Sequence, residues 1–307
     1  MKKEINNLSE LVGFVSSIGK ESNNLLAFRG EKKDYKETAL VPLIYRDEYI
    51  IYEDKIYRES QRFNDIEFYS DRAVFDRLSR IQHYTAPTRL IDVTEDLFSS
   101  IYFSISEKKA DKDKTDAILY IFEISKELIK YYDSDTVSVI SNLAKIPLNN
   151  SKNEKSKKKL LEDVLKYRDD IEKFNKQKSS EFLLYEIRDE KPQFLNKIDP
   201  AHLTSIQFVL PKLTSSRVRS QKGAFLLFGL NPDDYKTSFK LLKGDNLVLS
   251  DNNVNHPVLE IHQAVLKNSC ISEMQKELMS MGIKKSFIYP EIDKVSEFLK
   301  DQYIKKT

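Results

Sequence analysis

The run Asp116-Ala117-Ile118-Leu119-Tyr120-Ile121-Phe122-Glu123-Ile124 decides the fold class of this chain, because it is the clearest strand in the sequence. Further runs rich in apolar residues predict strands on both sides of it, at Leu25–Phe28, Phe182–Ile187, Ser205–Leu210, Ala224–Phe228, Phe239–Leu242 and Leu259–Val265. The later runs lie close together and lack long intervening helices, so antiparallel pairing is favoured over a doubly wound parallel sheet.

Helical spacing of apolar residues flanks these strands. It begins at Ile5, passes through Leu8, Val12, Val15 and Ile18, and stops at Gly19. Helical patterns are also predicted at Tyr49–Arg80, at Asp96–Ser106 and at Ile271–Met281, the last stopping at Gly282. A short strand is predicted at Ser286–Tyr289, followed by a final helix that Pro290 helps to start.

Residues 150–178 differ from the rest, since lysines and acidic residues are interspersed with apolar ones at helical spacing. This pattern favours a solvated, charged helical insertion over a nucleic-acid arm. We therefore predict one α+β domain spanning residues 1–307, with a mainly antiparallel sheet, early helices and a charged helical insertion at about 150–178.

Composition narrows the function classes. The chain has 307 residues, with 50 Lys+Arg against 48 Asp+Glu, so no global field draws it to nucleic acid or an anionic membrane, although a locally basic groove stays open. The single cysteine, Cys270, cannot form an internal disulfide, and no Cys/His spacing predicts a metal site. Without a signal peptide or an apolar run of about 20 residues, a soluble cytoplasmic protein that does not contact the membrane is expected.

The segment from Gln82 to Thr94 concentrates chemically active side chains: imidazole, phenol, guanidinium, carboxylate and hydroxyl groups. Pro87 restricts its own backbone and that of Ala86, which predicts a rigid turn presenting polar groups in a fixed array. His83 fits a general acid or base, or a donor to a backbone carbonyl. Tyr84 fits a ring that stacks on a ligand, or one that fills core.

The other polar residues of this segment have structural alternatives too. Arg89 and Asp92 invite a local ion pair whether or not a ligand binds. Thr88 and Thr94 fit helix caps, Thr94 particularly because a helix is predicted just after it.

Two further clusters lie far away in sequence. Arg29 ends an apolar run before Gly30, where a guanidinium could grip a phosphate while glycine lets a ligand approach the backbone; a structural arginine paired with a carboxylate is the alternative. Arg217, Arg219 and Gln221 would share one face of an extended segment and line a cleft, unless they form an exposed loop. The glycine, serine and histidine motifs of familiar ATPases, dehydrogenases, metalloproteases and hydrolases are absent from the sequence.

Taken in order, the three clusters resemble the FRG domain family, named for a Phe/Tyr-Arg-Gly signature. The matching residues are Phe28-Arg29-Gly30, Leu40-Val41-Pro42, Tyr45-Arg46, Tyr57-Arg58-Glu59, Gln82-His83-Tyr84, Pro87 to Thr94, Arg217-Val218 with Gln221, Gly223 and Phe225, and Met281-Gly282-Ile283 before Tyr289-Pro290. Thr85, where the family usually has glycine, and Ser99-Ser100-Ile101, where it favours a Val-Ala-Leu type run, depart from the pattern. The family has no assigned activity, but its members look like prokaryotic and phage-associated proteins suspected of defence or toxin roles.

A second resemblance concerns the order of the motifs. ADP-ribosyltransferases of the Arg–Ser–Glu kind place an arginine on an early strand, a Ser/Thr-rich strand before a short helix, and a Glu or Gln on a later strand around NAD; Arg29, the segment 88–94 and Gln221 follow that order. The resemblance implies NAD as substrate, an ADP-ribosyltransferase-like fold, and a protein or nucleic-acid acceptor. The usual Glu-x-Glu pair is absent from the sequence.

These resemblances give two hypotheses. In the first, a pocket processes a nucleotide, with NAD the leading substrate, and the protein is a defence or toxin effector. Its catalytic residues would be Arg29, His83, Arg89, Asp92 and Gln221, and its binding residues Gly30, Tyr84, Thr88, Thr94 and Arg217. In the second, the same residues form a non-catalytic module that binds a nucleotide, RNA or phage component. A third hypothesis, which needs no ligand, gives the motifs a purely structural role.

Overall fold

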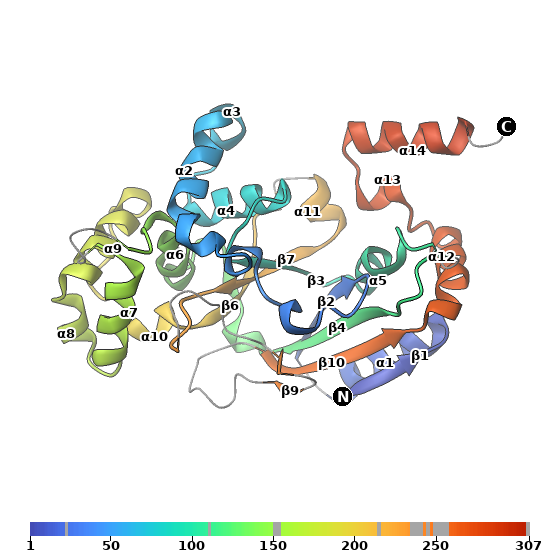
Figure 1. The fold of residues 1–307 in the computed structure, drawn as a ribbon, viewed down its shortest axis with the longest axis horizontal. Helices are drawn as coiled ribbons and strands as arrows, with labels where there is room; N and C mark the ends of the chain where they lie inside the picture. The colour runs from blue at the N-terminus through green and yellow to red at the C-terminus, as the bar shows by residue number, and fades with distance from the viewer. Residues whose placement is uncertain are drawn as a thin grey trace.

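An eight-stranded sheet forms the centre of the computed structural model, which describes residues 1–21, 24–109, 112–149, 155–213, 216–233, 242–243, 246–247 and 258–304. The strand order is β1-β10-β4-β2-β3-β7-β6-β5 (Figure 1). These strands are β1 Lys2–Ile5, β2 Leu25–Glu31, β3 Leu90–Thr94, β4 Ala117–Ile124, β5 Lys130–Tyr131, β6 Ile206–Leu210, β7 Gly223–Phe228 and β10 Val258–Leu266. Neighbours run antiparallel except β1 with β10 and β5 with β6, which confirms the mainly antiparallel sheet.

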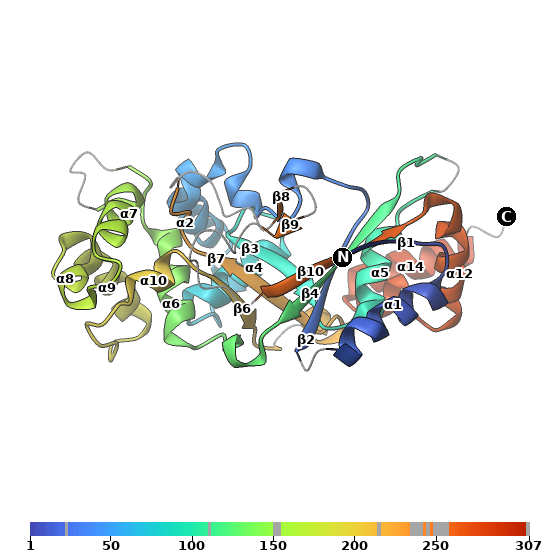
Figure 2. The same ribbon diagram turned by 90° about the horizontal axis from the view of Figure 1, so that it is seen from below.

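The helices gather in two groups at opposite ends of this sheet (Figures 1 and 2). One group contains α1 Leu8–Glu21, α5 Leu97–Ile105, α12 Ile271–Ser280, α13 Lys285–Ile288 and α14 Ile292–Ile304. The other contains α2 Glu53–Phe63, α3 Asp65–Phe68, α4 Val74–His83, α6 Asp135–Ser141, α7 Lys157–Lys166, α8 Ile171–Asn175, α9 Lys178–Glu190 and α10 Pro200–Leu203. The short helix α11 Ser216–Ser220 precedes β7, and β8 Leu242–Lys243 pairs with β9 Asn246–Leu247 apart from the main sheet.

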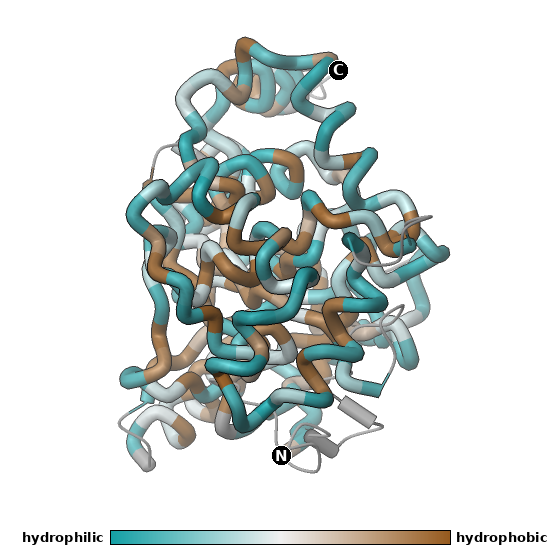
Figure 3. Tube along the Cα trace, turned by 90° about the vertical axis from the view of Figure 1, so that its left-hand side faces the viewer, coloured by the Kyte–Doolittle hydropathy of each residue, from teal (hydrophilic) through white to brown (hydrophobic). Residues whose placement is uncertain are grey.

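Alternation along the strands divides the apolar residues between the two faces of the sheet. One face forms a core that runs across both halves, from Phe122 of β4 to Phe208 of β6. The other face is covered twice: β4, β10 and Phe28 pack against α1, α5 and α12, whereas Phe225 and its neighbours pack against α4, α6 and α9. Figure 3 shows hydrophobic stretches in the interior of the trace and hydrophilic ones along its edges.

The sheet has two halves, β1-β10-β4-β2 and β3-β7-β6-β5, which are joined by a single residue pair. The ladder between β2 and β4 runs from Leu25 to Glu31, and that between β3 and β7 covers all of β3. Between β2 and β3 only Phe28 and Thr94 pair. The two helix groups stand on either side of this junction, which leaves the sheet uncovered between them.

Several sequence predictions need correction. Phe182–Ile187, predicted as a strand, lies in α9, whose buried residues Ser180, Leu183, Leu184 and Ile187 follow a helical spacing. Ser286–Tyr289 was also predicted as a strand, but its first three residues belong to the single-turn helix α13. Both runs are too short for their apolar content to separate a strand from a buried helix.

The first helix starts later than predicted and passes its expected stop. Ile5 belongs to β1, and α1 continues through Gly19 to Glu21. The helical pattern predicted over Tyr49–Arg80 is confirmed, and it consists of a 3₁₀ turn at Tyr49–Tyr52 followed by helices α2, α3 and α4.

Other predictions are confirmed. The strands at 25–28, 116–124, 205–210, 224–228 and 259–265 are β2, β4, β6, β7 and β10, and the helices at 96–106, 271–281 and after Pro290 are α5, α12 and α14. Helices α7 and α8 lie in the charged insertion. Of the predicted strand Phe239–Leu242, only Leu242, in β8, lies within the described residues. None of the helices in the described ranges is long and apolar enough to span a bilayer.

Candidate functional site

A cavity of about 790 Å³ lies over the junction of β2 and β3, between the two helix groups. Its walls come from β2, β3, β7, the end of α4, the loop around Val41 and the segment between α13 and α14. This volume is in the range of ligand sites for small organic molecules and cofactors. The open junction of the sheet therefore coincides with a space able to hold a ligand of nucleotide size.

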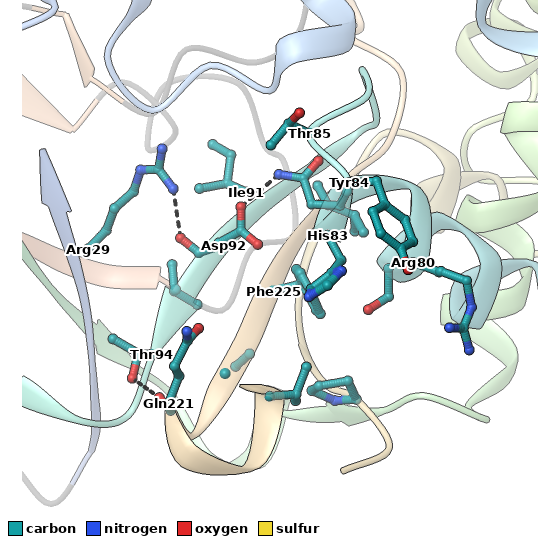
Figure 4. Close-up of a pocket in the computed structure, with 18 of the residues that line it drawn as sticks. Arg29, Arg80, His83, Tyr84, Thr85, Ile91, Asp92, Thr94, Gln221 and Phe225 are labelled. Carbon is teal, nitrogen blue, oxygen red and sulfur yellow. Dashed lines mark hydrogen bonds between the residues drawn. The ribbon is translucent and has the colours of Figure 1, made fainter. Parts of the chain in front are cut away.

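The three polar clusters of the sequence converge on this cavity (Figure 4). Seven of the ten predicted site residues line it: Arg29, Gly30, His83, Tyr84, Asp92, Thr94 and Gln221. Thr88 and Arg89 do not line it. Arg217 lies in α11, but its side chain is outside the described part of the structure.

Arg29 spans the junction from β2 to β3. Its Nη1 donates to the carbonyl of Asp92 at 2.8 Å, and its Nε donates to Oε1 of Glu31 at 3.0 Å. The guanidinium thus replaces ladder hydrogen bonds that the diverging strands cannot make. Within the described residues Nη2 of Arg29 donates no hydrogen bond, so one edge of the fork is available to a ligand.

Arg46 is a second cation that the site predictions missed. Nε and Nη2 donate to the carbonyl of Val41 at 3.0 and 2.6 Å, and among the described residues Arg46 forms no ion pair. Burial lowers the pKa of Arg46, and the charge of nearby Arg29 lowers it further. The other arginines and lysine on the cavity wall pair with carboxylates: Arg29 with Glu31 at 3.0 Å, Arg80 with Asp71 at 2.6 Å and Lys212 with Asp76 at 2.7 Å. Two neighbouring guanidiniums are typical of an anion site.

Asp92 is held by a chain of side-chain hydrogen bonds. Its Oδ2 accepts from Nε2 of Gln82 at 2.7 Å, and Oε1 of Gln82 accepts from the hydroxyl of Thr88 at 2.6 Å. Thr88 is buried, so this side of the chain is rigidly placed. The geometry explains the spacing of Gln82, Thr88 and Asp92: the first two orient the carboxylate that faces the cavity.

His83 is the last residue of α4, and the turn that follows it is tight. Thr85 has φ of 64°, in the left-handed region that glycine adopts without strain. This explains why a glycine suits the position at which the sequence has Thr85. The ring of His83 contacts that of Tyr84 edge to face, with centroids 5.0 Å apart.

Tyr84 is a surface ring and not part of the core, since 56 % of it is exposed. Its hydroxyl donates to Oε2 of Glu67 at 3.3 Å. Partial burial and the carboxylate of Glu67 both raise the pKa of Tyr84, so the phenol stays protonated at neutral pH. At the other wall, the rings of Phe103 and Tyr289 meet edge to face with centroids 6.2 Å apart, and both line the cavity.

A glycine is required at position 30 for a different reason from the predicted one. A Cβ there would lie 1.9 Å from the carbonyl oxygen of Ser100, so the glycine permits α5 to pack against β2. Close approach of a ligand to the backbone is not what excludes a side chain at this position. The backbone of Ser100 and Ser104 in α5 makes this contact with Gly30.

Thr94 is not the N-cap of α5. That role belongs to Asp96, whose side chain accepts from the backbone N–H of Ser99 at 2.9 Å. Thr94 instead donates from its hydroxyl to the carbonyl of Gln221 at 2.5 Å and accepts from the N–H of Asp96 at 2.8 Å. It therefore joins β3, α5 and the turn before β7.

Arg89 is fully buried and does not pair with Asp92. Its guanidinium meets the carboxylate of Glu53, with Nε 2.8 Å from Oε1, and Nζ of Lys157 lies 2.9 Å from Oε2 of the same Glu53. The local pair fails because residues three apart along an extended chain point to opposite faces. We assign Arg89 to this buried cluster and not to the cavity.

Gln221 lies between α11 and β7, and its Nε2 donates to the carbonyl of Ile288 at 2.8 Å. The predicted extended segment from Arg217 to Gln221 is wrong, since residues 216–220 are helical. Arg219 is exposed and donates to the carbonyl of Leu213 at 3.0 Å. Glu291 is also absent from the predicted site residues, although it directly follows Tyr289-Pro290 of the family resemblance. Arg46 is itself one of the residues that carry that resemblance.

Three residues outside the cavity could share a metal ion. Glu123 of β4 and Glu260 and His262 of β10 each offer an atom within 4.8 Å of the others. Nε2 of His262 already lies 2.8 Å from Oε1 of Glu123. None of the three lines the cavity.

Comparison with known proteins adds one finding. Residues 24–113 match the family model of the FRG domain, so the chain contains an FRG domain that includes β2, α2 to α4, β3 and α5. No curated protein and no solved structure matches the chain. The matched segment supplies Arg29, Arg46, His83 and Asp92, whereas Gln221 and Glu291 come from beyond it.

Proposed function

We propose that this FRG domain, completed by β7 and the C-terminal segment, binds NAD in the cavity and cleaves its nicotinamide–ribose bond. The observation that carries the proposal is the convergence of Arg29, Asp92 and Gln221 on one cavity over a divided sheet. Motif order alone predicts an ADP-ribosyltransferase-like site, and the geometry is compatible with one.

The diphosphate would lie between the two guanidiniums. Nη2 of Arg29 and the outer edge of Arg46 offer charged donors, and planar donors bind phosphate oxygens through parallel hydrogen bonds. The charge of Arg29 lowers the pKa of Arg46, and a bound anion would offset this repulsion between the two cations. Ring contacts come from Tyr84 at one wall and from Phe103 and Tyr289 at the other.

Bond cleavage needs a stabilised cation. Nicotinamide would leave with the electron pair of the glycosidic bond and become neutral, while positive charge develops on the ribose. The carboxylate of Asp92, fixed by Gln82, would stabilise this oxocarbenium ion. Water or a hydroxyl of an acceptor would then form the new bond to C1′ and release one proton.

The biological role follows from this chemistry. Cleavage of NAD would deplete the cellular pool, and transfer to a protein or nucleic acid would modify it. Either outcome suits a prokaryotic or phage-associated defence or toxin effector, the role that the family resemblance implies.

Nicotinamide release from NAD tests the proposal. The wild-type protein should release nicotinamide, Arg29→Ala should lower kcat/KM by roughly 10- to 100-fold through lost phosphate binding, and Asp92→Asn should lower kcat by about 10²-fold or more. Arg62→Ala is the control, because Arg62 is an exposed arginine that pairs with Glu59 on α2 outside the cavity. Absence of release by the wild-type protein, or release that Arg29→Ala leaves unchanged, would contradict NAD chemistry.

A second candidate is binding without turnover. It is favoured by Gln221, an amide committed to the carbonyl of Ile288 at the position where transferases of this kind can carry a glutamate. In that case NAD should stabilise both the wild-type protein and Asp92→Asn against heat, with no nicotinamide released from either.

A further inference from the structure

Glu291 brings a carboxylate from the C-terminal segment to the imidazole of His83. Its Oε1 lies 3.6 Å from Nε2 of His83, and both residues line the cavity. Oε2 of Glu291 is buried and accepts no hydrogen bond from the described residues. Both side chains retain slightly more than a quarter of their exposure, so the pair opens on the cavity and is not sealed in the core.

The segment that carries Glu291 is fixed to the rest of the site at several points. Nε2 of Gln221 holds the carbonyl of Ile288, three residues before Glu291. Tyr289 packs against Tyr102 and Phe103 of α5, with ring centroids 6.5 and 6.2 Å away. At the start of α14 the backbone N–H of Val295 donates to the carbonyl of Glu291 at 2.9 Å.

This arrangement has the composition of a proton-accepting pair. An imidazole beside a carboxylate is a frequent general base, because the carboxylate stabilises the imidazolium that forms. A separation of 3.6 Å is longer than a direct hydrogen bond, as is common in unliganded sites. Other charged groups near His83 are Arg80, one turn earlier on α4, and Glu67 of α3, which accepts from Tyr84.

We propose that His83 and Glu291 accept the proton of the attacking nucleophile, and that Gln221 is a positioning residue that holds the segment bearing Glu291. This inference rests on the proposed NAD reaction. When the oxygen of water or of an acceptor hydroxyl bonds to C1′, its O–H bond breaks and the proton passes to the pair and then to solvent. The proton enters through atoms of the pair on the cavity side, since Nε2 of His83 and Oε2 of Glu291 are both buried. The products are neutral nicotinamide, ADP-ribose or its O-linked adduct, and one proton.

The test combines rate, binding and pH profile. Glu291→Gln should lower kcat for nicotinamide release by about 10²-fold and leave the NAD dissociation constant within threefold. It should also move the fall in rate at low pH to a lower pH, because the imidazolium of His83 loses the carboxylate that stabilises it. Glu291→Asp should restore part of the rate. Gln221→Ala should lower kcat less and shift the pH profile, which loss of stability alone would not do.

Glu297→Gln is the matched control, because Glu297 lies on α14 and pairs with Lys285 and Lys294 outside the cavity. Azide distinguishes lost base catalysis from misfolding, since this anionic nucleophile needs no deprotonation. Added azide should therefore raise the rate of Glu291→Gln with formation of an azido product, and a misfolded variant would not respond.

The outcomes separate the two proposals. If the wild-type protein releases no nicotinamide, the proposed function and this inference both fail. If it does release nicotinamide, and Arg29→Ala lowers kcat/KM as expected while Glu291→Gln keeps the wild-type rate and pH profile, this inference alone is overturned. A Glu291→Gln variant that binds NAD with the wild-type dissociation constant, and is therefore folded, but that azide does not rescue also overturns it.

Discussion

Single residues in this protein have uses that differ from their apparent chemistry. The position of Gly30 beside Arg29 suggests that a ligand approaches the backbone there. In the structure, the carbonyl of Ser100 fills the space that a side chain at Gly30 would need. Thr88 does not reach the cavity, yet it orients Gln82 and through it Asp92. A polar motif can therefore owe its spacing to the support of a site as much as to contact with a ligand.

Gly30→Ala should destabilise the protein by about 3 kcal/mol or more, because the new Cβ forces β2 away from α5. Gly13→Ala is the control: no atom lies within 4 Å of the added Cβ in helix α1, so this change should stabilise by roughly 0.5–1 kcal/mol. Urea unfolding of the two variants measures both effects. Equal stabilities for the two variants would refute the packing account of Gly30.

At the scale of elements, a buried charge cluster joins parts of the chain that lie far apart in sequence. Glu53 begins α2, Arg89 precedes β3 and Lys157 begins α7, and all three side chains are buried. Burial alone would raise the pKa of Glu53, but Arg89 and Lys157 outweigh it and hold this pKa below the ordinary value of 4.5. The charged insertion is thus attached to the FRG domain through an ion cluster.

Glu53→Gln should cost about 3–5 kcal/mol at neutral pH, because it leaves two buried cations without their partner. Because the folded pKa lies below the unfolded one, the contribution of Glu53 is complete above pH 4.5 and is lost as the pH falls through the folded pKa. The stability difference between wild type and variant should therefore be constant from pH 7 to 5 and shrink below that. Glu59→Gln, an exposed change on the same helix, should show little effect. A difference that grew on acidification would contradict this assignment.

At the scale of the whole molecule, the cavity depends on how the apolar core is distributed over the sheet. The core is continuous on one face of the sheet and divided into two clusters on the other. The core between Phe122 and Phe208 extends behind the junction, while the two helix groups in front leave it uncovered. Arg29 and Asp92 connect the halves through one hydrogen bond. A ligand bound there would contact both halves at once.

NAD at 100 times its dissociation constant should therefore stabilise the folded protein by about 2.7 kcal/mol, seen as a rise in Tm of several degrees. Arg29→Ala with Arg46→Ala should abolish that rise. The Tm of the free double variant should itself be lower, because buried Glu31 loses its partner and the hydrogen bond from Arg29 to Asp92 is lost, so the rise is measured against the Tm of each free variant. Arg62→Ala should retain the full rise. A rise that survives in the double variant would place the ligand elsewhere.

Much of the fold was accessible from local pattern. Apolar runs located β4, β7 and β10, and helical spacing located α5 and α12, because burial of one face imposes a period that depends only on nearby residues. The run at 182–187 misled because its polar partners Ser179 and Ser180 are buried, and hydropathy does not mark a buried serine as part of a helical face.

The sequence by itself determined the three polar clusters, their family resemblance and the antiparallel sheet, since each of them depends on patterns among residues that are close together in the sequence. Only the tertiary structure decided which members of those clusters meet. It removed Arg89 to a buried pair with Glu53, added Arg46, and brought Glu291 beside His83 from more than 200 positions away. Such contacts depend on strand register and on the packing of helices over the sheet, which no local pattern of residue types encodes.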